Sequence, residues 1–433
     1  ESALCAPDSA LGDLNLFADG EQELLTTFSG TAAAYAREKT VHALFEEVVA
    51  KAPEAQAVIA CDGTYTYGAL NARANGIAKR LMAAGVKPND LVAVVLPRTG
   101  GLIAAIFGIL KSGGAYLPVD PEYPAERIQY MLSDSGAKAI ITTRGQALHG
   151  YAGPVLYAED LVGETGENPG VEMTSEDLCY CIYTSGTTGN PKGVMLSHNI
   201  LVSNAIATSA AHDCGLGYRA LSFLTLCHVY ERMMNYHFQY KGTSIYYLEN
   251  MGAIADTMRE IKPHIANTVP RLLEKIYDNI INKGKNLPWL KKQIFFWAVT
   301  LGLKFNLRGN SRFYRFRLGI ARKLVFNKWK EALGGELRML VSGGAALQSR
   351  LERIFWAAGI PVLQGYGLTE TSPVIAVNPF RLPDIKFETV GPVLDGVQVR
   401  IADDGEILCK GPNVMMGYYR EPELTAEAID ADG

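Results

Sequence analysis

The residues with the clearest chemical potential form the run Tyr183-Thr184-Ser185-Gly186-Thr187-Thr188-Gly189-Asn190-Pro191-Lys192-Gly193. Glycines and small residues let backbone N–H groups approach an anion, while hydroxyls and a lysine add donors and positive charge. A polyphosphate suits such a loop. The spacing is not that of a P-loop, because Lys192 follows a proline and precedes a glycine. The run therefore predicts a nucleoside triphosphate site outside the P-loop class, with a flexible Ser/Thr/Gly surface loop as the alternative.

Two further glycine-containing runs follow strand-like segments. Leu337–Ser342 closes with Ser342-Gly343-Gly344-Ala345-Ala346, and Pro361–Gln364 precedes Gly365-Tyr366-Gly367-Leu368-Thr369-Glu370. In open α/β sheets, ligands bind beyond the carboxyl ends of the strands, so we expect these loops to converge on one crevice. Ordinary turns between a strand and a helix are the alternative for both runs.

The elements that would position these runs alternate along the chain. Helices are predicted over 41–52, 67–84 and 101–111, and buried strands over 91–96 and 139–143. This alternation predicts an α/β fold with doubly wound parallel sheets. From about residue 385 to 433 we expect a small β unit, because Asp403-Asp404-Gly405 is a hairpin signal. Residues 1–40 lack sustained periodicity and are expected to be a linker-like segment.

Composition excludes several classes of protein. The chain has 433 residues and 48% hydrophobic content, which is typical of a globular protein with a large core. A net charge of −4 does not favour a nucleic-acid partner. No apolar run reaches the length of a membrane span. Seven scattered cysteines without a Cys-x-x-Cys pair favour a reducing cytoplasm. Cys227, beside His228, is a candidate reactive thiol or simply a small buried hydrophobe.

One segment has an unusual charge pattern. Between residues 279 and 330 there is no Asp or Glu, while Lys, Arg and aromatic residues are interleaved. One interpretation is a helical pair with a solvated basic face. The other is a surface for anionic lipid headgroups or for an acidic thiol donor such as CoA, which predicts cytoplasmic localisation with peripheral membrane contact.

The first run resembles the phosphate-binding signature of the adenylate-forming (AMP-binding) superfamily, and Gly365–Glu370 resembles its second signature. That superfamily includes acyl-CoA synthetases, luciferases and the adenylation domains of nonribosomal peptide synthetases. The resemblance implies two doubly wound sheets and a small β-barrel-like unit. It also implies a two-step reaction. A carboxylate attacks the α-phosphate of ATP, giving an acyl-adenylate and pyrophosphate, and a thiol then attacks the adenylate.

The resemblance also implies roles for individual residues. The loop Thr184, Ser185, Gly186, Thr187, Thr188, Gly189 and Lys192 would hold the β- and γ-phosphates. Tyr366 would stack on adenine, with Gly343, Gly344, Ala345, Gly365 and Gly367 around it. Thr369 would bind the α-phosphate, and Glu370 with Thr184 would ligate Mg²⁺. His228, Val229, Gly344 and Gly367 would face the acid. Lys192, His228, Thr369 and Glu370 would be catalytic, although His228 could instead be a core histidine.

The resemblance differs between the two parts of the chain. Residues 64–75 and 110–121 are similar to signatures of peptide-synthetase adenylation domains, and residues 1–40 resemble the linker after a condensation domain. Residues 221–234, 242–247, 269–277 and the basic segment resemble long-chain acyl-CoA synthetases. An artificial chimera of two family members is an alternative explanation of this split.

The predicted substrate is a fatty acid. Adenylation domains for α-amino acids carry an aspartate near His228 that pairs the substrate ammonium, and His228-Val229-Tyr230-Glu231-Arg232 has none. Glu231 could serve, but Arg232 is expected to take its charge. The acceptor would be a phosphopantetheine thiol on CoA or on a carrier protein. An amino-acid-activating domain and a non-catalytic module that binds a nucleotide or an acyl-adenylate are the alternatives.

The C-terminal small domain of the superfamily is expected to be missing. It begins after a Trp-Phe-x-Thr-Gly-Asp run, and this chain ends at Asp430-Ala431-Asp432-Gly433. Residues 41–433 are thus predicted to be the large adenylation core alone. Such a core should bind nucleotide and acid, adenylate slowly and transfer little acyl group to a thiol.

Overall fold

A seven-stranded sheet forms one side of the molecule, with the strand order β17-β8-β7-β4-β3-β5-β6. The structure is a computed structural model that describes residues 35–148, 150–161, 166–184, 191–248, 250–380, 385–431 and 433. The central strands are parallel and buried along their length, as expected for continuous apolar runs. The strands are β3 (Leu91–Val95), β4 (Ala115–Pro118), β5 (Ala139–Thr142), β6 (Val155–Tyr157), β7 (Leu178–Thr184), β8 (Lys192–Ser197) and β17 (Gly417–Tyr418).

A second sheet has eight strands in the order β14-β13-β12-β11-β9-β10-β1-β2. Its pairs from β13 to β1 are parallel, whereas the edge strands β2 and β14 are antiparallel to their neighbours. The strands are β1 (Gln56–Ala60), β2 (Gly63–Thr66), β9 (Arg219–Ser222), β10 (Ser244–Tyr247), β11 (Ile265–Thr268), β12 (Met339–Ser342), β13 (Val362–Gly367) and β14 (Val374–Val377).

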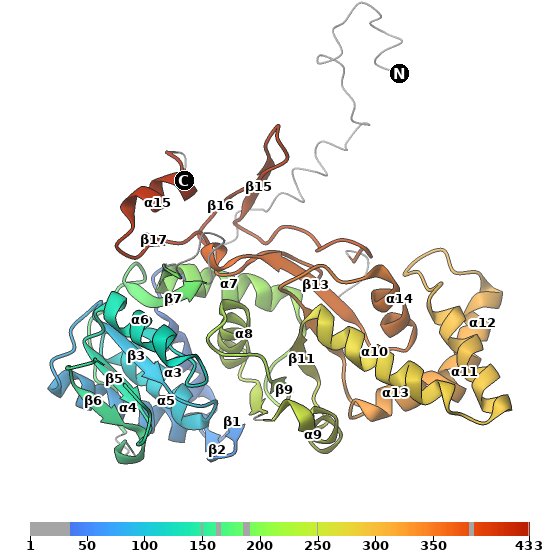
Figure 1. Cartoon of the computed structure of the whole chain (residues 1–433), viewed down its shortest axis with the longest axis horizontal. Coiled ribbons are helices and arrows are strands. Elements are labelled where there is room, and N and C mark those ends of the chain that lie inside the picture. Colours follow the sequence, from blue (N-terminus) through green and yellow to red (C-terminus); the bar gives the residue numbers. More distant parts are fainter. Residues whose placement is uncertain are drawn as a thin grey trace, which may run out of the picture.

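A helical layer lies between the two sheets (Figure 1). It consists of α3 (Val41–Lys51), α5 (Gly100–Lys111), α7 (His198–Ala211) and α8 (Val229–Tyr240). Helix α5 packs on β3 and β4 of one sheet and on β1 and β2 of the other, so every one of its residues is buried. A helix in this position must be apolar on all sides. Its last residue, Lys111, forms an ion pair with Glu46 on α3.

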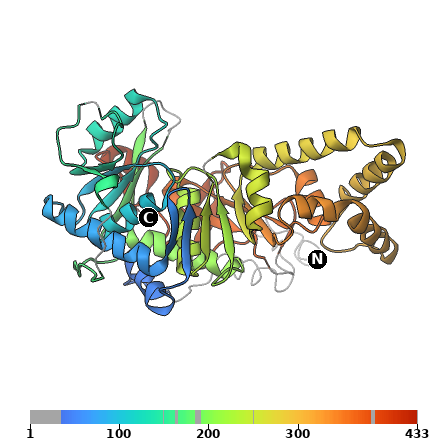
Figure 2. The ribbon, with the colours of Figure 1, turned by 90° about the horizontal axis from the view of Figure 1, so that it is seen from below.

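Other helices cover the outer faces. α4 (Tyr67–Ala83) packs on α5, and α6 (Ala125–Ser135) shares a core cluster with the seven-stranded sheet. A separate core cluster joins the second sheet to a further group of helices, several of which project from one end of the molecule (Figure 2). These are α9 (Ile254–Ile261), α10 (Pro270–Lys285), α11 (Trp289–Gly302), α12 (Arg312–Ala321), the π-helical turn η4 (Arg322–Phe326), α13 (Asn327–Ala332) and α14 (Ser349–Ala357). Among the described residues, no helix combines the length and apolar character needed to cross a membrane.

The predicted α/β class with two doubly wound sheets is confirmed, and the helices expected near 41–52, 67–84 and 101–111 correspond to α3, α4 and α5. β15 (Gln398–Ile401) and β16 (Ile407–Lys410) form the hairpin predicted around Asp403-Asp404-Gly405, followed by α15 (Pro422–Ala428). β17 then extends the seven-stranded sheet by pairing with β8, because an open sheet edge offers unpaired backbone groups.

Candidate active site

The two ends of the predicted phosphate loop lie opposite each other on a β-hairpin. Thr184 ends β7, Lys192 begins β8, and the two residues are paired across the antiparallel ladder. This pairing holds both side chains at one end of the hairpin. The predicted phosphate ligands between them, Ser185, Gly186, Thr187, Thr188 and Gly189, lie outside the described residues.

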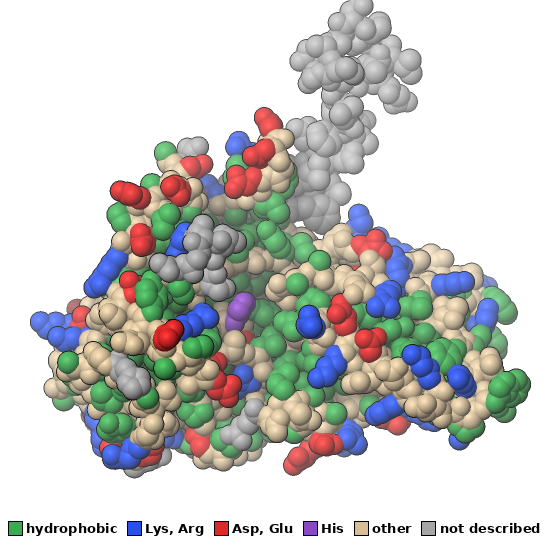
Figure 3. Space-filling model, in the orientation of Figure 1, with side chains coloured by type: hydrophobic (Ala, Val, Ile, Leu, Met, Phe, Trp, Pro, Cys, Tyr) green, Lys and Arg blue, Asp and Glu red, His purple; other side chains and the backbone are tan. Residues whose placement is uncertain are grey.

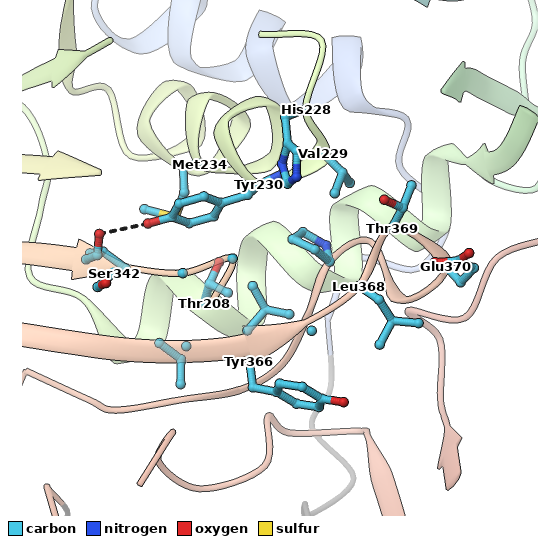
Figure 4. Close-up of a pocket in the computed structure, with 18 of the residues that line it drawn as sticks. Thr208, His228, Val229, Tyr230, Met234, Ser342, Tyr366, Leu368, Thr369 and Glu370 are labelled. Carbon is cyan, nitrogen blue, oxygen red and sulfur yellow. Dashed lines mark hydrogen bonds between the residues drawn. The ribbon is translucent and has the colours of Figure 1, made fainter. Parts of the chain in front are cut away.

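Thr184 and Lys192 open onto a cavity of about 440 Å³, a volume in the range of small-molecule sites. Figure 3 shows a hollow at the centre of this face with a histidine visible in it. Its walls come from both sheets and from the helical layer between them, and Figure 4 shows the side chains around it. Besides residues predicted from the sequence, the walls include Thr208, His212, Tyr230, Met234, Val341, Ser342, Leu368, Pro373, Val374, Val377 and Tyr418.

The structure brings most of the predicted site residues together on this cavity. They are Thr184, Lys192, His228, Val229, Gly343, Gly344, Gly365, Tyr366, Gly367, Thr369 and Glu370. Ala345 lies instead on an adjoining cavity of about 640 Å³ that shares Tyr366 with the first. The Tyr366 side chain is 37% exposed, and an aromatic ring of this kind can stack on a nucleobase. The convergence of these residues is observed, while their individual roles stay predictions.

The run Gly365–Glu370 is held in place by a close contact between its backbone and that of Pro373. A Cβ on Gly367 would lie 1.6 Å from the carbonyl oxygen of Pro373, so only glycine fits there. Directly after it, the short helix η5 (Thr369–Thr371) carries Thr369 and Glu370 to the cavity. The backbone N–H of Met415 donates a 2.8 Å hydrogen bond to the Glu370 carbonyl, which ties this turn to the C-terminal segment.

A tyrosine that the sequence did not mark lies between two predicted residues. The Tyr418 hydroxyl donates a 2.9 Å hydrogen bond to Glu370 Oε1, and Lys192 Nζ lies 5.2 Å from the centre of the Tyr418 ring. Burial and the contact with Glu370 raise the pKa of Tyr418 to about 12, so the hydroxyl stays protonated near neutral pH. Only the pairing of β17 with β8 brings Tyr418 to the cavity, and no local motif announces that pairing.

His228 is accessible from the cavity and is fixed as the N-cap of α8. Its Nδ1 accepts the backbone N–H of Tyr230 at 3.2 Å. Partial burial lowers the pKa of His228 below its usual value, so the ring is neutral at pH 7. Because Nδ1 accepts, the proton lies on Nε2, which is the ring nitrogen left to donate to a ligand.

The neighbouring Cys227 does not behave as an activated nucleophile. It lines a different cavity of about 360 Å³, and burial raises the pKa of its thiol to about 12. A thiol in this state carries almost no thiolate at neutral pH. The structure therefore favours the second sequence interpretation, in which Cys227 is a small hydrophobe.

Glu231, the acidic residue considered as a partner for a substrate ammonium, already has hydrogen-bond partners inside the protein. Glu231 is fully buried and accepts hydrogen bonds from the Ser222 hydroxyl and, at 2.9 Å, from Asn267 Nδ2. Burial raises the pKa of Glu231. The positive charge of Arg232 opposes this rise in the pKa of Glu231, as expected from their proximity. Within the described residues no ion pair joins the two side chains, and the Arg232 guanidinium lies 4.9 Å from the ring centre of Tyr236. Glu370 is the one carboxylate among the described lining residues.

The available donors fit Mg²⁺ bound together with a nucleotide. Glu370 and Thr184 both line the cavity. Within the described ranges, no group of three or more His, Cys, Asp or Glu side chains could hold a metal ion by itself. Mg²⁺ is commonly held by one or two carboxylates plus phosphate oxygens and water. These residues therefore suit an ion that shares its coordination sphere with phosphates.

Two parallel-rich sheets with a shared cavity at the ends of their strands define an α/β protein with a ligand site in the position usual for open α/β sheets. The chain belongs to the AMP-binding enzyme family, which matches residues 45–419. Membership confirms the adenylate-forming ligase class and supports ATP-dependent adenylation of a carboxylic acid.

Known proteins similar to this chain include members of both kinds, which confirms both resemblances. Tyrocidine synthase 3 from Brevibacillus parabrevis is 31% identical over 98% of this chain, which covers 6% of that protein. Long-chain-fatty-acid–CoA ligase FadD15 from Mycobacterium bovis is 30% identical over 85% of this chain and 66% of its own length. The chain thus spans less than two thirds of each of these relatives. The solved N-terminal domain of FACL13 from Mycobacterium tuberculosis shares the fold, with a TM-score of 0.71, 22% identity and coverage of 91% and 94% of the two chains.

Proposed function

We propose that this chain carries out ATP-dependent activation of a fatty acid to an acyl-adenylate, for transfer to a phosphopantetheine thiol on CoA or a carrier protein. The carrying observation is the make-up of one cavity. Polar groups suited to phosphates lie on it with Val229, Met234, Val341, Val374 and Val377, and its described lining offers no carboxylate except Glu370. An ammonium buried there without a partner would be costly, whereas an alkyl chain gains from burial.

The residues would act where charge develops. Attack of a carboxylate oxygen on the α-phosphorus of ATP adds negative charge at phosphorus and expels pyrophosphate, so donors must face that point. Lys192 and the Thr369 hydroxyl would stabilise this charge, and His228 Nε2–H would orient the attacking carboxylate. Glu370 and Thr184 would hold Mg²⁺, which when bound neutralises charge on the phosphates.

The substrate class is tested by calorimetric binding of two non-hydrolysable acyl-adenylate analogues, one with a long fatty acyl group and one with an aminoacyl group. We expect the fatty analogue to bind at least about tenfold more tightly, which corresponds to ~1.4 kcal/mol. Tighter binding of the aminoacyl analogue would reject the fatty-acid proposal.

The alternative substrate is an α-amino acid, and the 31% identity to tyrocidine synthase 3 favours it. An ammonium in this cavity would need an acidic partner, and Glu231 is engaged by Ser222 and Asn267. An aminoacyl analogue whose affinity falls in a Glu231→Gln variant, with the fatty analogue unaffected, would support the amino acid.

A non-catalytic nucleotide-binding module is the second alternative. The placement of Lys192, Thr369 and Glu370 on one cavity favours the enzyme, because a module that only binds nucleotide has no need of a metal ligand. Nucleotide binding that is independent of Mg²⁺ would favour the module.

We also propose that the outer helices contact an anionic lipid surface. Exposed apolar side chains recur every three to four residues along α12 and η4, at Phe313 (68%), Phe316 (67%), Ile320 and Leu324, and Trp289 (73%) is exposed at the start of α11. Exposed basic residues flank them, including Arg312, Arg315, Arg322 and Lys323. Interfacial aromatic residues combined with positive charge suit anionic headgroups.

Flotation with phosphatidylcholine vesicles, with and without phosphatidylserine, tests this surface. We expect binding that requires phosphatidylserine and is lost in a Phe313→Ser/Phe316→Ser variant. Leu216→Ser is the control, since Leu216 is also exposed (58%) but lies outside the outer helices. Equal flotation of wild type with both vesicle types would reject the proposal.

A further inference from the structure

Two buried polar side chains on the active-site cavity, His212 and Ser342, have no hydrogen-bond partner in the described part of the chain. His212 is 3% exposed, and neither of its ring nitrogens has a hydrogen-bond partner among the described residues. It follows the last residue of α7 and lines the cavity together with Thr208. The chain path sets this position. The 6 residues of β8 lead away from Lys192 and the 14 of α7 lead back, lengths of roughly 20 Å and 21 Å.

The neighbouring His237, unlike His212, has hydrogen-bond partners for both ring nitrogens. His237 on α8 lies 5.6 Å from His212 between ring centroids. Thr208 Oγ1 donates its proton to the Asn204 carbonyl at 2.8 Å, so it accepts from His237 Nδ1–H at 3.1 Å. His237 Nε2 is then the acceptor for the Cys214 thiol at 3.0 Å. One histidine is fully satisfied inside the protein, and the other is left open on the cavity.

An unsatisfied imidazole is costly in such a place. A buried donor or acceptor without a partner loses its hydrogen bonds to water and gains none in return, and a leucine would avoid that loss. Ser342 Oγ is likewise buried, finds no hydrogen-bond partner among the residues that the structure describes, and lines the same cavity. A bound molecule that offers hydrogen-bonding groups along its length would remove the cost at both positions.

We propose that the acid activated here carries a hydroxyl group on its acyl chain, and that His212 recognises that hydroxyl. The inference rests on the proposed function, because it takes activation of a long-chain acid as given. A hydroxyl both donates and accepts, and so matches a neutral imidazole, which has one donor and one acceptor nitrogen.

The charge of the site favours a hydroxyl over an ionic group. Burial lowers the pKa of His212 to about 4, so the ring is neutral at pH 7. It then offers no positive charge to a second carboxylate and no negative charge to an ammonium. Ser342 is neutral as well, so neither open group could compensate the desolvation of an ion.

The test compares the affinities of acyl-adenylate analogues of equal chain length, measured by calorimetry on the 433-residue protein. One analogue has an unsubstituted alkyl chain, and the others carry a hydroxyl at different positions. We expect wild type to prefer at least one hydroxylated analogue by about tenfold. His212→Leu should lose this preference, and His212→Gln, which keeps a donor and an acceptor, should retain most of it. Val374→Ala, which trims another wall of the cavity, should weaken both kinds of analogue equally and keep the preference.

Two results would overturn the inference. One is equal affinity of wild type for the unsubstituted analogue and every hydroxylated analogue. This result is obtained on wild type alone and does not depend on whether a variant folds. The other is a hydroxyl preference that survives in His212→Leu. Failure of the proposed function looks different, because wild type would then bind no fatty analogue of either kind, or would bind the aminoacyl analogue more tightly than all of them.

Discussion

Three side chains from three separate elements meet at the phosphate end of the cavity. Tyr418 on β17 donates from its hydroxyl to Glu370 on η5 at 2.9 Å, and its ring faces Lys192 Nζ on β8 at 5.2 Å. The donor occupies only one of the two carboxylate oxygens, Oε1, so Oε2 remains available to a cation. Tyr418 is therefore a positioning residue for both Lys192 and Glu370.

A Tyr418→Phe variant tests this arrangement. It removes a hydrogen bond to a charged group and keeps the ring beneath Lys192. We expect the affinity for Mg²⁺-ATP, measured by calorimetry, to fall at least about tenfold, since such bonds contribute ~1.5 to 3 kcal/mol. Adenosine, which lacks phosphates, should bind as in wild type. Tyr419→Phe is the matched control, because its hydroxyl donates to the Ser135 carbonyl at 3.0 Å and the residue does not line the cavity. Unchanged Mg²⁺-ATP affinity in Tyr418→Phe would contradict the role.

For individual side chains, the sequence alone identifies those site residues that belong to continuous motifs. Lys192, Thr369 and Glu370 belong to stretches whose residue types and order indicate phosphate chemistry, and all line one cavity. Tyr418 and His212 could not be found in this way. One reaches the cavity through a strand pairing between distant segments, and the other through the return path of α7. Long-range packing of this kind leaves no local pattern.

The end of β13 illustrates how an element is constrained by its neighbour. Gly367 runs so close to the Pro373 carbonyl that any side chain would overlap backbone atoms, which cannot move aside as a flexible side chain can. We predict that Gly367→Ala destabilises the protein by several kcal/mol or prevents folding, because β13 and β14 must separate. Urea unfolding followed by circular dichroism measures this.

Gly319→Ala is the matched control, because a side chain has room at this glycine. Gly319 lies within α12, and a Cβ there meets nothing within 4 Å. Alanine should stabilise this helix by about 0.5–1 kcal/mol, since glycine loses more backbone freedom on folding. If Gly367→Ala were no less stable than Gly319→Ala in the same urea experiment, the close approach of β13 to Pro373 would be wrong.

Helices and strands with a clear hydrophobic pattern could be predicted from the sequence, whereas the order in which strands pair in the sheets could not. The apolar faces of α3 and α4 and the buried run of β3 are visible in the sequence. In contrast, β1 and β2 lie early in the chain but join the eight-stranded sheet beside β10. β17 shows the same limit, since it is too short to reveal its partner and extends the seven-stranded sheet by pairing with β8.

Across the whole molecule, the helical layer between the sheets removes several histidines from solvent. His198 at the start of α7 and His212 at its end are both buried, and burial lowers the pKa of each to about 4. Neither can accept a proton readily while the two sheets stay closed over this layer. Protonation of these rings is therefore linked to opening of the fold.

The linkage has a definite sign and window. An exposed histidine has a pKa of about 6.5, so between pH 6.5 and 4 the unfolded chain binds protons that the folded chain excludes. Stability is fully present above pH 6.5 and falls as the pH drops through this window, by about 2 kcal/mol per histidine between pH 7 and 5. We predict that His212→Gln loses about 2 kcal/mol less than wild type when urea unfolding free energies at pH 7 and pH 5 are compared. Carboxylates also titrate over this range, but their contribution is common to both proteins and cancels in the difference. Identical losses in the two proteins would show that His212 accepts a proton in the folded state as easily as in the unfolded chain, and that the layer between the sheets is open to water.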